Sequence, residues 1–193
     1  MKINLEKCDF LKQELVYLGC VISKGELKID PSKVEAIINW PTPRAVGEVQ
    51  SFHGLALFYR KFIRNFSNIC APILDTIKRR GKTKFEWNDV ANNSFEELKQ
   101  EVAKYPILVL PNSTKVFTIE FDARGFAIGV VLSQEGRHVA FFSEKLNEAK
   151  KKYSSYDLEL YTMVQALKIW RHYLLPKEFI VYTNNHALSF LNG

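Results

Sequence analysis

The pattern of apolar and polar positions divides the chain into three parts. In residues 5–29, the β-rich run at residues 16–22 leads into a turn with Gly25 at its tip, which predicts a hairpin. Residues 30–105 place apolar side chains three and four positions apart, as helices do. Residues 106–193 change character: residues 116–122 alternate strongly between apolar and polar positions, and the part as a whole predicts strands around one long helix. We therefore expect an α+β fold in two lobes.

Capping residues mark where the helices of the middle part begin. Asp30 is an N-cap followed by proline, and residues 42–43 repeat this pattern for a second helix. Gly54 within the second helix would allow a close approach or a break. Asn88 or Asp89 caps a further helix, so this part is expected to be a small helical region.

The third part predicts a sheet of three consecutive antiparallel strands at residues 116–122, 127–132 and 139–142, with a turn at residues 135–136. A long amphipathic helix is expected over residues 156–174. Its inward side chains should be Leu160, Met163, Val164, Leu167 and Leu174.

The last elements follow Pro176, which ends the long helix. Residues 179–183 predict a fourth strand, and residues 188–191 predict the start of another helix. The element order in this part is therefore three strands, a helix, a strand and a helix.

Composition indicates an ordinary soluble intracellular protein. The 193 residues are 47% hydrophobic and 25% charged, which suffices for one large domain or two small ones. There is no apolar run of about 20 residues that would span a membrane, and the N-terminus does not resemble a signal peptide. The three cysteines form no CxxC pair and predict neither disulfides nor a zinc site. We expect the protein in the cytoplasm or the nucleus.

The net charge of +6 is concentrated in one stretch of the chain, residues 60–84. This stretch has one acid, Asp75, and eight basic residues: Arg60, Lys61, Arg64, Lys78, Arg79, Arg80, Lys82 and Lys84. A local basic surface favours a polyanionic partner such as nucleic acid. A solvated surface of lysine and arginine fits the same pattern, so both interpretations stay open.

Three polar residues lie where predicted elements end or begin. Asp122 closes the first strand of the third part, Glu159 lies in the first turn of the long helix, and Asn184 closes the fourth strand. If the first and fourth strands are neighbours, these groups converge, and their oxygens suit Mg²⁺ or Mn²⁺. Each also has a purely structural explanation, as a turn residue or as an acid at a helix N-terminus.

Longer phrases of the sequence resemble a known family. FDARGFAIGVVLSQEG, VAFFSEKL, YSSYDLELYTMVQALKIWRHYLLPKEF and YTNNHAL resemble the ribonuclease H domain of gypsy-type LTR retrotransposon Pol polyproteins. Upstream, YLGCVIS, IDPSKVEAIINWPTP and EVQSFHGLALFYRKFIRNFS resemble the end of the reverse transcriptase palm and its thumb. The resemblance is colinear and covers practically the whole chain.

The resemblance implies three regions. Residues 1–29 would end the palm with a hairpin that positions the primer end, and residues 30–105 would form the thumb and connection. Residues 106–193 would be a ribonuclease H-like domain that lacks its C-terminal end. The parent enzyme would copy RNA into DNA and hydrolyse RNA in RNA–DNA hybrids with two Mg²⁺. A binding module without catalysis, or a non-functional remnant, are the alternatives.

The resemblance also implies a nuclease site of four carboxylates. Asp122 and Glu159 match the first two, Asn184 stands where the third is expected, and the fourth would lie beyond Gly193. The polymerase aspartates of the family lie upstream of the matching segment, and no Asp-Asp pair occurs in these 193 residues. An asparagine carbonyl can contact a cation but does not offset its charge. The chain by itself is therefore expected to be inactive or strongly impaired.

For the duplex, the resemblance implies contacts from the hairpin and from a thumb helix that follows the minor groove. The candidate nucleic-acid-binding residues are Gly19, His53, Gly54, Arg60, Lys61, Arg64, Lys78, Arg79, Arg80, Lys82 and Lys84. The four phenylalanines of the thumb stretch are expected in the core rather than against bases. They are Phe52, Phe58, Phe62 and Phe66.

We predict that calorimetric titration with Mg²⁺ or Mn²⁺ shows weak binding or a single ion per chain, because two carboxylates do not offset two divalent ions. An assay with an RNA–DNA hybrid should show little or no cleavage. Cleavage that is lost in Asp122→Asn would contradict this prediction.

Overall fold

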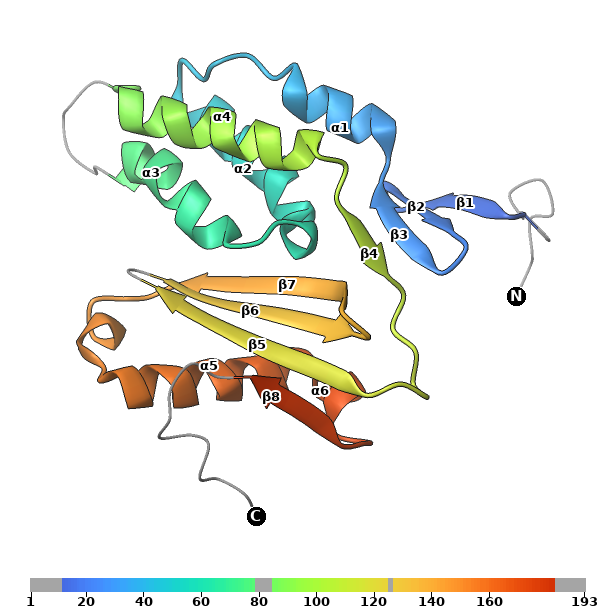
Figure 1. Cartoon of the computed structure of the whole chain (residues 1–193). Helices are drawn as coiled ribbons and strands as arrows, with labels where there is room; N and C mark the ends of the chain where they lie inside the picture. The colour runs from blue at the N-terminus through green and yellow to red at the C-terminus, as the bar shows by residue number, and fades with distance from the viewer. Residues whose placement is uncertain (1–11, 79–84, 125–126, 183–193) are drawn as a thin grey trace, which may run out of the picture.

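The computed structural model describes residues 12–78, 85–124 and 127–182, with the side chains of residues 122–124 excepted. Its main parts are two four-stranded sheets, a helical unit and a long helix that packs on the second sheet (Figure 1). The first sheet is antiparallel and has the order β1-β2-β3-β4. Its strands are β1 (Glu14–Tyr17), β2 (Cys20–Ser23), β3 (Glu26–Ile29) and β4 (Ile107–Val109).

The N-terminal hairpin has one more turn than the sequence predicted. The turn at Gly25 is confirmed, but residues 16–22 are two strands, because the chain reverses at Leu18 and Gly19. Both residues have positive φ, +48° and +70°. A run of β-forming residues gives no signal for such a turn except the glycine, and we had interpreted Gly19 as part of a strand.

The helical unit lies between β3 and β4 in the chain. It comprises α1 (Pro31–Ile38), α2 (Val46–Phe58), the short 3₁₀ helix η2 (Arg60–Phe62), α3 (Phe66–Lys78) and α4 (Asp89–Ala103). The predicted caps are confirmed at two helices. Asp30 accepts a hydrogen bond from the Ser32 amide at 2.9 Å, and Asn88 accepts one from the Ala91 amide at 2.9 Å.

Two details of this unit differ from the prediction. Helix α2 begins at Val46 instead of residues 42–43, and its first turn is held by Glu48, which accepts a hydrogen bond from the Arg44 amide at 2.7 Å. It continues through Gly54 without a break and ends at Phe58. The sequence pattern did not predict α3 as a separate helix. Helix α3 contains Pro72.

The helices enclose a core that reaches the first sheet. Phe52 packs against Phe95 at 4.6 Å between ring centroids and against Trp40 at 5.9 Å, which ties α2 to α4 and to the end of α1. Cys20 and Ile29 of the sheet belong to the same buried cluster. The thumb-like helices and the hairpin therefore form one packed body.

The second sheet has the order β7-β6-β5-β8, formed by β5 (Phe117–Arg124), β6 (Ala127–Gln134), β7 (Arg137–Lys145) and β8 (Phe179–Tyr182). The three consecutive antiparallel strands are confirmed, and so is the position of the fourth strand beside the first, since β8 pairs in parallel with β5. The expected α+β fold is therefore correct.

The long helix of this lobe is shorter than predicted. Helix α5 (Ser155–Ile169) is capped by Ser154 at its start and by Trp170 at its end, and the short α6 (Arg171–Leu174) follows it. The predicted inward face was partly wrong, because Leu160 and Val164 are 38% and 40% exposed. The fully buried positions are polar or small, Thr162 and Ala166. Hydrophobicity alone misplaced this face because the helix is apolar on more than one side.

The two lobes meet at β7, which lies at the edge of its sheet beneath the helical unit (Figure 1). The Ser67 amide donates to the Ser143 hydroxyl at 2.8 Å, and the Ser67 hydroxyl donates to the Ser143 carbonyl at 2.9 Å. Phe141 of β7 packs against the helical core. The edge strand is thus covered by α3 instead of remaining open.

We predict that Gly19→Ala destabilises the fold by about 2 kcal/mol or more, because it combines a left-handed backbone with a steric clash. A Cβ at position 19 would lie 2.6 Å from the Tyr59 hydroxyl oxygen. Gly25→Ala is the matched control, since its φ is +79° but nothing lies within 4 Å. It should cost only about 1 kcal/mol of backbone strain. Urea unfolding measures the stability of both variants. Equal losses of stability would show that the contact with Tyr59 is unimportant.

Candidate functional site

The tip of the β1–β2 hairpin rests on the end of α2. The Tyr59 hydroxyl donates a hydrogen bond to the Gly19 carbonyl at 3.3 Å. Burial raises the pKa of Tyr59 to about 12, with smaller contributions from the charges of Cys20 and Asp30, so the hydroxyl keeps its proton. Gly19 is therefore required for tight packing against the helical unit, and this contact fixes the hairpin beside α2.

Helix α2 has one face that no other described element covers. Gln50, Gly54 and Phe58 follow one another at intervals of four residues and are all exposed. Gly54 has no neighbouring atom within 4 Å of a built Cβ, so the surface there is open rather than closely packed. The expectation that Phe58 belongs to the core was wrong, because its side chain is 53% exposed. Phe52, Phe62 and Phe66 are buried as expected.

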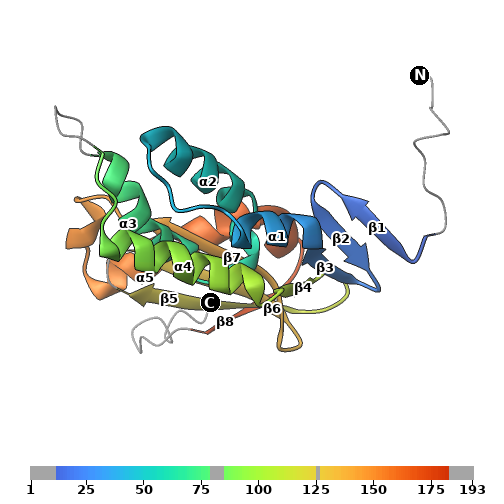
Figure 2. The same ribbon diagram turned by 90° about the horizontal axis from the view of Figure 1, so that it is seen from above.

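Gln50 was missed in the sequence. The signal that could have found it is its spacing of four residues from Gly54, which places both on one helix face. Figure 2 shows the hairpin beside the helical unit. Phe58 and Gly19 are neighbours in space, because a Cβ at position 19 would lie 3.8 Å from the Phe58 ring. The hairpin tip and the open face of α2 therefore border one another.

His53 lies at the side of this face and is half-buried. Its ring centroid is 6.3 Å from that of Phe66. Burial lowers the pKa of His53 below its ordinary value, which favours the neutral imidazole. At neutral pH His53 can donate or accept a hydrogen bond, but it contributes no positive charge to a phosphate contact.

The basic candidates are spread along the helical unit. Arg60 and Lys61 are exposed in η2, directly after α2, and the Lys61 ammonium lies 5.4 Å from the centroid of the Phe62 ring. Lys78 ends α3 and pairs with Asp75 at 3.0 Å. The other four candidates fall outside the described residues: Arg79, Arg80, Lys82 and Lys84.

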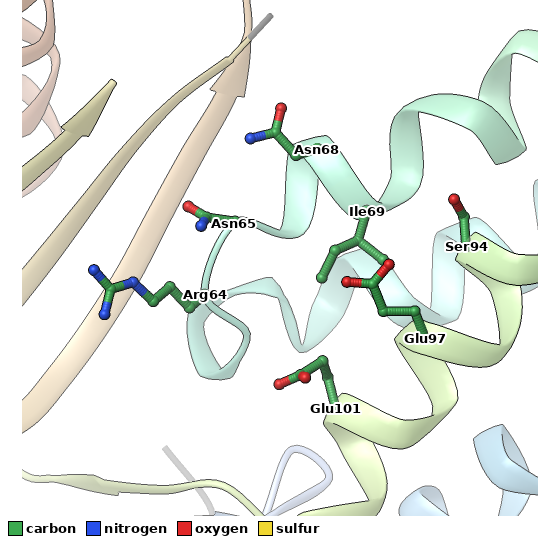
Figure 3. Close-up of a pocket in the computed structure, with 7 residues that line it drawn as sticks. All are labelled: Arg64, Asn65, Asn68, Ile69, Ser94, Glu97 and Glu101. Atoms are coloured by element: carbon green, nitrogen blue, oxygen red, sulfur yellow. The ribbon is translucent and has the colours of Figure 1, made fainter. Parts of the chain in front are cut away.

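Arg64 lines a polar hollow of about 450 Å³ between the start of α3 and α4. Figure 3 shows that its guanidinium points away from the carboxylates of Glu97 and Glu101. Asn65 and Asn68 supply amide groups to the same wall. This mixture of one cation, amides and two acids does not select a particular ligand. Arg64 thus belongs to the hollow between α3 and α4.

The nuclease candidates are only partly described. Asp122 lies on β5 opposite Gly129, and Glu159 lies on α5, which packs on β5 and β6. Glu159 was expected in the first turn of the long helix. Because α5 begins at Ser155, Glu159 is its fifth residue and lies just past that turn. The parallel register places Tyr182, the last described residue of β8, beside Glu120. The chain thus leaves β8 near the end of β5 that carries Asp122.

The metal site itself stays a prediction. Asn184 and the Asp122 side chain fall outside what the structure describes. Among the described side chains, no three of His, Cys, Asp and Glu are grouped so as to hold a metal ion. The described helices also include none that is long and apolar enough to cross a membrane.

Comparison with known sequences identifies relatives of this arrangement. Residues 87–181 match the family model of the RNase H-like domain found in reverse transcriptase. The Retrovirus-related Pol polyprotein from transposon 297 of Drosophila melanogaster is 38% identical over the whole chain, which covers 18% of that protein. The polyprotein from transposon gypsy of the same species is 35% identical over 98% of the chain and 19% of its own length. The chain spans about a fifth of these relatives.

Comparison with solved structures shows the same fold. The foamy viral protease-reverse transcriptase in complex with dsDNA matches 94% of this chain and 38% of its own, with a TM-score of 0.81 and 22% identity. The same viral protein in complex with an RNA/DNA hybrid matches 92% of this chain and 24% of its own, with a TM-score of 0.81 and 23% identity.

We predict that His53 titrates below its ordinary pKa near 6.5. Since the unfolded chain then binds the proton more readily than the folded chain, stability should fall as the pH drops from about 6.5 through the folded pKa. NMR titration of the imidazole and urea unfolding at several pH values test this. The variant His53→Gln should lose less stability than the wild type between neutral and acidic pH. A pKa of His53 at or above 6.5 would contradict the prediction.

Proposed function

Through residues 87–181 the chain belongs to the family of RNase H-like domains found in reverse transcriptase. We propose that it is a functional part of an enzyme that combines RNA-directed DNA polymerase and ribonuclease H activities. Such an enzyme copies RNA into DNA and hydrolyses the RNA of RNA–DNA hybrids, in the cytoplasm or the nucleus. In this role the chain holds the duplex between the polymerase site and the ribonuclease site. It would do so as part of a Pol polyprotein, as its relatives are. The colinear match over the whole chain favours this function over an isolated binding module.

The observation that carries the proposal is the contact between the hairpin tip and α2. It brings the turn at Gly19 and the exposed row of Gln50, Gly54 and Phe58 together on one surface. This row carries no charge and contains a glycine, so it can approach a groove closely. A primer end held at the hairpin would then continue as a duplex along α2.

Charged residues at the end of α2 complement this neutral face. Arg60 and Lys61 follow directly in η2 and are exposed. In the proposed complex they would contact phosphates at the border of the groove that faces α2. Phosphate contacts of this kind position a duplex without reading its sequence, which suits an enzyme that copies any template.

The second lobe supplies the nuclease position of the proposed enzyme. Asp122 and Glu159 would hold a divalent cation there, and the carboxylate donors fit such an ion. When bound, Mg²⁺ or Mn²⁺ would activate water and stabilise charge on the phosphodiester. Asn184 adds no negative charge, so the donors in this chain suit one ion better than two. We expect any nuclease activity of this chain alone to be weak or absent for that reason.

We predict that Gln50→Glu weakens binding of an RNA–DNA hybrid by about tenfold, a loss of about 1.4 kcal/mol, because it adds an acid to the surface that would face the groove. Gln100→Glu is the matched control, since it makes the same chemical change at an exposed position of α4. Fluorescence anisotropy with a labelled hybrid measures both. Equal affinities of the two variants, or a wild-type chain that binds no duplex, would refute the proposed role of α2.

A further inference from the structure

A second group of basic side chains lies where the two lobes meet. Asp75, three residues before the end of α3, accepts hydrogen bonds from Lys78 at 3.0 Å and from Lys145 at 3.2 Å. Lys78 belongs to the helical unit, and Lys145 is the last residue of β7 in the other lobe. One carboxylate therefore lies between two ammonium groups from different lobes.

The charge of this group is not balanced. Burial alone would raise the pKa of Asp75, but the hydrogen bonds from Lys78 and Lys145 outweigh it and the pKa is lowered. The carboxylate is therefore ionised at neutral pH and offsets one of the two positive charges. Each ammonium has three N–H donors, and an oxygen of a second anion could accept from both.

More lysines continue this surface beyond β7. The short helix η3 (Lys150–Lys152) consists of three lysines. Lys150 donates to Glu144 at 2.9 Å and also contacts the Tyr161 hydroxyl, and Lys151 pairs with Glu148 at 2.6 Å. The Tyr161 hydroxyl donates to Glu144 at 2.8 Å, which ties η3 to α5 and to β7.

These lysines share one end of the molecule. The end of β7, the start of α5 and the C-terminal end of α3 lie on the same side in Figure 1. Within this surface five lysines (Lys78, Lys145, Lys150, Lys151 and Lys152) are accompanied by four acids, Asp75, Glu144, Glu148 and Asp157. Ion pairs near the surface contribute little to stability, so structural support alone does not explain why Lys78 and Lys145 converge on one carboxylate from different lobes.

We propose that this group, which we call the junction lysines, is a phosphate-binding surface for the backbone of a nucleic-acid duplex. It would be separate from the face of α2, and it rests on the proposed function. Contacts there are electrostatic, independent of sequence and sensitive to salt. Because Lys78 and Lys145 come from different lobes, a phosphate held between them would bind both lobes at once. A duplex that leaves the thumb-like unit would thus be guided toward the second lobe.

The test measures the affinity of the full chain for a labelled DNA duplex over a series of salt concentrations. In the double variant Lys78→Gln and Lys145→Gln, the log–log salt slope should become shallower by about 1 to 2, since each lost phosphate contact removes about 0.9. Affinity at low salt should fall by about tenfold. The double variant Lys99→Gln and Lys104→Gln on α4 is the matched control, because both lysines there also pair with acids. It should leave the slope unchanged.

Asp75→Asn provides a test in the opposite direction. Removing the shared carboxylate leaves both ammonium groups uncompensated, so the duplex should bind more tightly and with a steeper salt slope. A merely structural role of Asp75 would give weaker or unchanged binding instead. If the wild-type chain binds duplex but neither variant changes the slope, the junction lysines are not a binding surface and the proposed function is untouched. If the wild-type chain binds no duplex, the proposed function fails as well.

Discussion

The arrangement of this protein depends on the pairing of β4 with β3. The two strands are antiparallel, with Lys28 opposite Ile107 and Glu26 opposite Val109, and the Leu110 amide donates to the Gly25 carbonyl at 2.8 Å. Because β3 precedes the helical unit and β4 follows it, this pairing holds both ends of the unit on the first sheet. The entropy cost of closing so long a loop grows only slowly with its length, and it is offset by the core shared between the helices and the sheet. With both ends of the unit fixed, the end of α2 is held against the hairpin tip.

The same pairing determines how the second lobe is attached. Strand β4 leads through a short connection into β5, while Ser67 and Ser143 join α3 to the edge strand β7 by two hydrogen bonds. Arg137 at the start of β7 also bonds to Glu26 of the first sheet at 2.6 Å. The lobes are therefore in contact at several points of β7 and not connected by a linker alone. An edge strand that would otherwise invite association with another chain is used as the boundary between the lobes.

The chemistry of the surfaces follows from this attachment. The exposed row on α2 is uncharged and includes a glycine, whereas positive charge lies beyond its end in η2 and at the junction of the lobes. A glycine allows a helix to approach a groove of a duplex closely, and cations contact the phosphate backbone. A neutral face flanked by charge therefore suits a protein that holds a duplex without reading it. The metal-binding candidates Asp122 and Glu159 belong to the lobe to which such a duplex would be led.

Local interactions made much of this fold predictable from the sequence. The caps at Asp30 and Asn88, the turn at residues 135–136 and the strands of the second sheet all depend on neighbours along the chain, and each was found. The family, and with it the candidate nuclease residues, also followed from the sequence, because long phrases were matched in order. Tertiary packing decided the rest. Only the contact with Tyr59 shows why the chain turns at Gly19, and only the packing of α5 on its sheet buries Thr162 in place of Leu160. The exposure of Phe58 and the approach of Lys78 to Lys145 depend on residues far apart in the chain, whose distances no local pattern encodes.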